Sequence, residues 1–215
     1  MDYHPKKEIA NTISHGIGLV MALFASPLLL IRAWETGEGI RILSIVIYVF
    51  GLLTVYFSST LYHASKKPRQ KVRLRIWDHI SIYYLIAGTY TPFIALFWNF
   101  WWAPYFLAGL WFLVLIGTVF KLYFTHRFKI ISTAAYVIMG WMVLPIAKPV
   151  FNLLPSDLLF WLGIGGIFYM IGVVFYLWKK LFYHHAIWHV WVMLGSISHF
   201  IAIWNSVSVE MLRAN

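Results

Sequence analysis

The chain contains no cysteine among its 215 residues. It therefore forms no disulfide bond and offers no thiolate, so any metal site must be built from His, Asp or Glu. Charge is also scarce, because Asp, Glu, Lys and Arg together make up only 11% of the residues, against roughly 25% in a typical soluble domain. This shortage of charged residues argues against a soluble domain and favours an integral membrane protein.

Acidic residues are the rarest charged class, with 7 Asp and Glu against 17 Lys and Arg and a net charge of +10. Such an excess is also typical of nucleic-acid-binding proteins. Here the basic residues follow the expected membrane topology, and anionic lipid headgroups account for them. We therefore expect membrane lipids as partners and no nucleic acid.

Apolar residues are abundant at 61%, aromatic residues reach 20%, and the mean hydropathy is +0.76. Uncharged apolar stretches run over residues 13–31, 42–62, 79–97, 103–120, 130–147, 158–178 and 185–209. Each approaches the roughly 20 helical residues that cross a hydrocarbon core of about 30 Å. The sequence therefore predicts an all-α membrane protein: one domain over residues 1–215, folded as a bundle of seven transmembrane helices.

An odd number of spans places the two termini on opposite sides of the membrane. Of the 17 Lys and Arg residues, all except Arg32, Arg41, Lys148 and Arg213 fall on the side of the N-terminus. Cytoplasmic loops carry the excess of Lys and Arg in membrane proteins. We expect a cytoplasmic N-terminus and an outside C-terminus.

Polar residues recur at the cytoplasmic ends of three predicted spans. Ser59 and His63 lie four residues apart and share one helical face, as do His185 and His189, and Asp78 opens the third span. Three neutral imidazoles with an open fourth position are typical of catalytic zinc. Asp78 suits an outer role, hydrogen-bonding to a ligand of the metal.

A single histidine in a membrane helix usually hydrogen-bonds to a neighbouring helix, and only the combination favours a metal. His184 competes with its neighbour as a ligand, whereas His199 lies roughly 15 Å further along the same helix. Glu8, Asn11 and His15 form a polar stripe on the first span, for which a packing role and a role beside the metal both stay open.

Five segments carry a resemblance to a known family: EIANTISHGIG (8–18), SSTLYH (58–63), WDHISIYYLIAGTYTPF (77–93), THRFK (125–129) and HHAIWH (184–189). They resemble the bacterial hemolysin III family, which is grouped with the progestin and adipoQ receptors (PAQR) and is more distantly similar to alkaline ceramidases. The resemblance implies a multi-pass protein of the bacterial cytoplasmic membrane. It also implies that His63, His185 and His189 bind zinc and that Asp78 contacts water at the zinc.

Three functions remain open at this stage. The first is a zinc-dependent hydrolase of a lipid amide or ester, with Asp78 as general base and Ser59 donating to the oxyanion. The second is a non-enzymatic protein of membrane lipid homeostasis, or a receptor-like protein, with structural zinc. A cytolytic pore ranks last, because seven permanent spans and a retained first span do not suit a secreted toxin.

Overall fold

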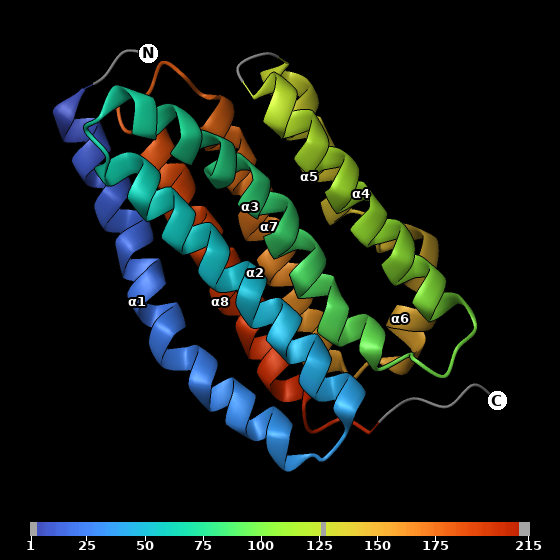
Figure 1. The fold of residues 1–215 in the computed structure, drawn as a ribbon. Coiled ribbons are helices and arrows are strands. Elements are labelled where there is room, and N and C mark those ends of the chain that lie inside the picture. Colours follow the sequence, from blue (N-terminus) through green and yellow to red (C-terminus); the bar gives the residue numbers. More distant parts are fainter. Residues whose placement is uncertain (1–3, 126–127, 211–215) are drawn as a thin grey trace.

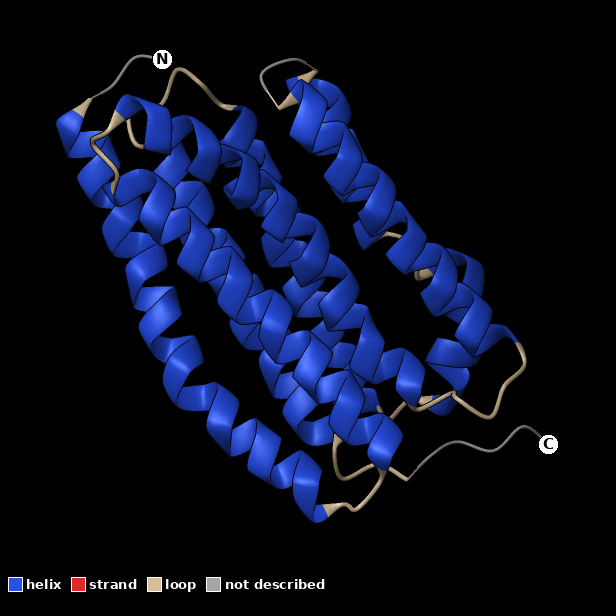
Figure 2. Cartoon of the chain, viewed as in Figure 1, coloured by secondary structure: helices blue, strands red, loops and turns tan. Residues whose placement is uncertain are grey.

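The computed structural model describes residues 4–125 and 128–210, which form eight α-helices, one short 3₁₀ helix and no strand (Figures 1 and 2). The helices are α1 (Pro5–Glu35), α2 (Gly39–Ala64), α3 (Pro68–Ala95), α4 (Trp102–Phe124), α5 (Lys129–Gly140), η1 (Leu144–Ile146), α6 (Ala147–Leu153), α7 (Ser156–Leu177) and α8 (His184–Ser206). Arg213 lies outside the described residues, as do His126 and Arg127 of the THRFK segment. The predicted all-α class is confirmed.

Among the described residues, six helical segments are long and apolar enough to cross a membrane. They are α1, α2, α4, α7, α8 and the segment Ile130–Leu153, which joins α5, η1 and α6. That segment is interrupted where Pro145 opens η1 and Pro149 follows four residues later. Each proline lacks the N–H group that would continue the helical hydrogen bonds, so the helix is broken there.

The third expected span, α3, is absent from these six, so the count of seven crossings is not confirmed. This helix is 28 residues long and lies against α2 and α4. Its hydropathy is lowered by Asp78 and by buried hydroxyl-bearing residues such as Ser81, Thr89 and Thr91. Its buried face therefore combines these polar residues with apolar ones such as Ile80, Leu85 and Phe93.

Helix α1 turns mostly polar and small residues toward the bundle and large apolar residues outward. The buried residues of α1 are Asn11, Ser14, His15, Gly18, Ala22, Ser26, Leu29 and Ala33. On the opposite face, Ile13, Phe24 and Ile31 are more than half exposed. Lipid is as apolar as leucine, so helices in a membrane associate through close packing and hydrogen bonds rather than through hydrophobic burial. The exposed apolar surface is what a lipid-facing protein requires.

Two contacts show how closely the helices approach one another. A Cβ atom at Gly51 of α2 would lie 2.6 Å from the carbonyl oxygen of Tyr84 on α3. At the end of the bundle that holds the C-terminus, Arg41 donates to the carbonyl oxygens of Ser206, Val207 and Val209 at 3.0, 2.5 and 2.7 Å. These bonds tie the start of α2 to the end of α8.

Candidate metal centre

Three histidines converge at the end of the bundle that holds the N-terminus (Figure 1). His63 stands in the last turn of α2, and His185 and His189 stand on one face of the first two turns of α8. One ring nitrogen from each lies within 4.8 Å of the others. His63 is 5% exposed, His189 is fully buried and His185 is partly buried, so the rings of His63 and His189 lie away from solvent.

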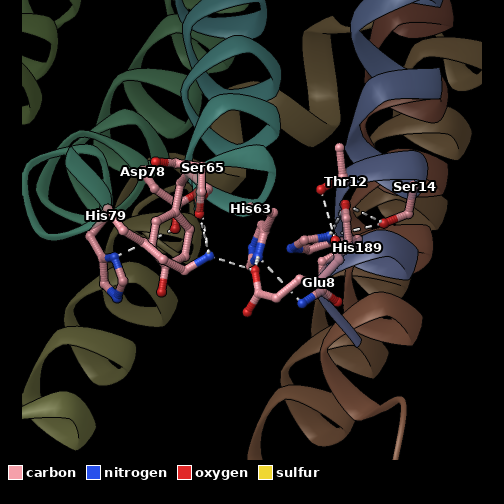
Figure 3. A network of polar contacts seen from close by, with 11 residues as sticks. Glu8, Thr12, Ser14, His63, Ser65, Asp78, His79 and His189 are labelled. Atoms are coloured by element: carbon pink, nitrogen blue, oxygen red, sulfur yellow. Dashed lines mark hydrogen bonds and ion pairs between the residues drawn. The ribbon is translucent and has the colours of Figure 1, made fainter. Parts of the chain in front are cut away.

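The second ring nitrogen of His63 is held by α1 (Figure 3). Its Nδ1 atom lies 3.0 Å from Glu8 Oε2 and 3.3 Å from Asn11 Nδ2. The same Glu8 oxygen accepts a hydrogen bond from Lys71 Nζ at 2.7 Å. A carboxylate that accepts the Nδ1 proton fixes the tautomer and leaves the lone pair on Nε2, as in many zinc sites.

His189 is oriented in the same manner, also by α1 (Figure 3). Its Nδ1 atom lies 3.0 Å from Ser14 Oγ and 3.3 Å from the carbonyl oxygen of Asn11. The Nε2 atoms of His63 and His189 are both buried and have no hydrogen-bond partner in the described part of the chain. Buried polar atoms in proteins are nearly always partnered. Two orphaned imidazole nitrogens that converge with a third therefore fit a metal ion.

The remaining histidines lie around this group or away from it. The ring of His15 stacks on that of His189, with 3.6 Å between ring centroids. His184 is not part of the convergent group, which contains His185. His199 points to another helix, with its Nε2 atom 3.2 Å from the carbonyl oxygen of Leu162 on α7.

The two residues expected to act beside the metal are buried. Ser59, one turn before His63 on α2, is 1% exposed, and its hydroxyl has no hydrogen-bond partner within the described residues. Asp78 on α3 is 7% exposed, and its carboxylate lies 3.6 Å from His79 Nδ1. Asp78 is not among the ligand atoms that converge. Figure 3 shows Asp78 and His79 on one side of His63, with His189 on the other.

Sequence reasoning missed Ser14 and Lys71. Ser14 lies three residues from Asn11, so the helical spacing of the α1 stripe contained a signal for it. Lys71, in the first turn of α3, is one of several cations between Lys66 and Arg75, and nothing in the sequence distinguishes it from its neighbours.

Comparison of the sequence with known proteins identifies the family of this chain. The sequence profile described as Haemolysin-III related matches residues 3–200. The Hemolysin-3 homolog of Bacillus subtilis (strain 168) is 41% identical over 205 residues, which cover 92% of this chain and 93% of the relative. This chain belongs to the haemolysin-III-related family.

Two further relatives extend the comparison. The Hemolysin-3 of Bacillus cereus is 40% identical over 204 residues, covering 92% of this chain and 90% of that protein. The human Monocyte to macrophage differentiation factor is 27% identical over 201 residues, covering 91% of this chain and 82% of the human protein. The resemblance carried by the motifs is confirmed, and with the apolar helices it makes this haemolysin-III-related chain a multi-pass membrane protein.

Proposed function

We propose that this protein is a zinc-dependent membrane enzyme that hydrolyses an amide or ester bond of a lipid, with His63, His185 and His189 as zinc ligands. One observation carries the proposal: three histidine nitrogens converge, two of them are buried without a partner, and the second nitrogens of those two rings are already engaged. A site with three protein ligands leaves a fourth position open, which distinguishes catalytic from structural zinc sites.

The proposed topology has seven crossings, with α3 as the one that hydropathy alone does not find. The length of α3 supports this, because 28 helical residues exceed what a hydrocarbon core requires. The N-terminus lies at the same end of the bundle as the α2–α3 loop and the first turns of α3, which together carry six of the basic residues (Figure 1). By the positive-inside rule, that end faces the cytoplasm of the bacterial cell.

Zinc suits the donor set, because imidazole is among its preferred ligands and the chain offers no thiolate. When bound, zinc supplies a Lewis acid that polarises a carbonyl group and lowers the pKa of water. In this scheme Asp78 accepts the proton of the attacking water, and the partnerless hydroxyl of Ser59 donates to the oxyanion. The apolar outer surface supports membrane lipids as the source of substrate, and membrane lipid homeostasis as the role.

A second candidate function is favoured by the contacts of α1. Because Glu8, Asn11 and Ser14 engage the second nitrogens of His63 and His189, a zinc ion held there would join α1 to α2 and α8. Such an ion would staple three helices whose packing a bound lipid could shift, as in a receptor-like protein. This function needs no proton acceptor at Asp78.

The two candidates separate in one experiment. Bound zinc is quantified in the purified wild type and in the Asp78→Asn and His63→Ala variants, and each is incubated with a lipid extract whose products are measured by mass spectrometry. Asp157→Asn serves as the control, because Asp157 opens α7 at the opposite end of the bundle. The enzyme requires product from the wild type and the control, with none from Asp78→Asn despite full zinc content. Full zinc with unchanged lipids favours the staple, and a wild type without zinc refutes both.

A further inference from the structure

A second set of buried polar groups runs along the interior of the bundle beyond the histidines. On α2, Tyr48, Tyr56, Ser59 and His63 are buried and share one helical face. At a rise of about 1.5 Å per residue, this face carries polar groups over roughly 22 Å from His63 to Tyr48. The distance is a large part of the membrane thickness, so polar groups reach far into the apolar region.

Most of these groups are orphaned as well as buried. The hydroxyl groups of Tyr48 and Ser59, and both ring nitrogens of His15, have no hydrogen-bond partner in the described part of the chain. These three residues and Tyr56 are 2% exposed or less. Leaving four such atoms dry would cost a large share of the free energy of folding.

The groups form a connected series rather than a scatter. The His15 ring stacks on His189 at 3.6 Å and meets the Tyr56 ring edge-on at 5.2 Å. The hydroxyl of Tyr169 on α7 lies 3.0 Å from Ser196 Oγ on α8. The ring contacts therefore lead from the candidate metal centre through His15 to Tyr56, and Tyr48 lies about two turns further along the same face of α2.

Glycines on two helices make room for the tyrosine rings. A Cβ atom at Gly18 of α1 would lie 2.4 Å from Tyr56 Cε1, and one at Gly195 of α8 would lie 2.8 Å from Tyr169 Cε2. The rings are thus seated against helix backbones. Each is fixed in place while its hydroxyl remains inside the bundle.

We propose that His15, Tyr56 and Tyr48 line an internal track of bound water that leads from the three histidines toward the middle of the membrane. Water supplies both donors and acceptors, which the imidazole nitrogens and phenol hydroxyls require, and buried water typically serves such groups. This inference rests on and deepens the proposed function, because the track would hold water beside the histidines, where hydrolysis consumes it. The water itself is detectable whether or not the protein is a hydrolase.

X-ray hydroxyl-radical footprinting of the full-length protein in lipid nanodiscs tests the track, because radicals formed from bound water label the side chains next to it. Tyr48 and Tyr56 should be labelled several-fold faster than Phe97, an aromatic residue that is fully buried and has no polar atom. Labelling of both tyrosines at the rate of Phe97 overturns the proposal. Lipid turnover is assayed on the same sample, so a labelled but inactive protein refutes the hydrolase and leaves the track standing.

Tyr48→Phe provides a second test that does not depend on labelling. If water binds the hydroxyl, its removal loses a hydrogen bond and lowers the unfolding temperature by about 2–4 °C. If no water binds the hydroxyl, Tyr48→Phe should raise the unfolding temperature, because the substitution removes a buried polar group that has no hydrogen-bond partner. An unfolding temperature that rises in Tyr48→Phe therefore overturns the proposal.

Discussion

Replacing Glu8 by Gln changes the candidate metal centre without removing a ligand. Glu8 Oε2 accepts from His63 Nδ1 at 3.0 Å and from Lys71 Nζ at 2.7 Å, and its side chain is 18% exposed. The amide oxygen of Gln keeps the hydrogen bond to Nδ1 but loses the negative charge that makes the imidazole more basic. Lys71 keeps contacts with the carbonyl oxygens of Tyr62 and Ser65 at 3.2 and 3.4 Å, so the fold should tolerate the change.

The expected result is a loss of zinc affinity. Replacing a residue that orients a metal-binding histidine typically costs 10- to 100-fold in affinity, and Glu8→Gln should fall near the lower limit because one hydrogen bond survives. A tenfold loss corresponds to about 1.4 kcal/mol. The stabilisation that zinc confers at a fixed free concentration above Kd should fall by a similar amount.

Competition with a zinc-binding dye measures the affinity, using purified protein in nanodiscs. Glu38→Gln is the matched control, because Glu38 also pairs with a cation, Arg41, but at the opposite end of the bundle. The reasoning fails if Glu8→Gln and Glu38→Gln bind zinc with the same Kd as the wild type. It also fails if both weaken binding equally, since that would indicate a general effect of charge.

Three further predictions follow from the packing and the metal. Gly51→Ala should destabilise the protein by about 1–3 kcal/mol, because the new Cβ atom meets the backbone of Tyr84. Gly163→Ala, with no atom within 4 Å, should leave thermal unfolding unchanged. Arg41→Ala should cost about 3 kcal/mol in the same assay, because its hydrogen bonds to the end of α8 are lost, and Arg41→Lys should restore only part of it. Chelation of zinc should lower the unfolding temperature of the wild type but not of His63→Ala; equal shifts would contradict the assignment.

Six of the seven expected spans correspond to long apolar helical segments, because hydropathy measures the same property that places a segment in lipid. The stretch expected over 42–62 is Gly39–Ala64 in the structure, and that expected over 103–120 is Trp102–Phe124. For two helices the expected stretch was too short. Helix α1 begins at Pro5 rather than near residue 13, and α3 begins at Pro68 rather than at 79. Hydropathy marks only the part of a helix that lies in lipid, whereas the helical hydrogen bonds continue into the polar residues on either side. The helices are therefore longer than the apolar stretches.

The convergence of the histidines was predictable from helical spacing and charge. Four-residue spacing placed His185 and His189 on one face, and the basic loops placed them at the same end of the bundle as His63. The partners of the second nitrogens were not predictable, because they depend on how α1 is rotated against α2 and α8. The same limit applies to Asp78, whose position on α3 was clear but whose carboxylate lies beside His79.

The buried face of α1 contacts both the candidate metal centre and the proposed water track. Its members recur every three or four residues and are small or polar, so the helix offers lipid its large apolar side chains and offers the bundle Asn11, Ser14, His15 and Gly18. Asn11 and Ser14 engage two of the converging histidines, and one turn further Gly18 seats the ring of Tyr56. His15 lies between these two sets of contacts, because its ring stacks on His189 and meets the Tyr56 ring edge-on. A rotation of α1 by one residue would remove both sets of contacts together, so the orientation of this helix sets the chemistry of the interior.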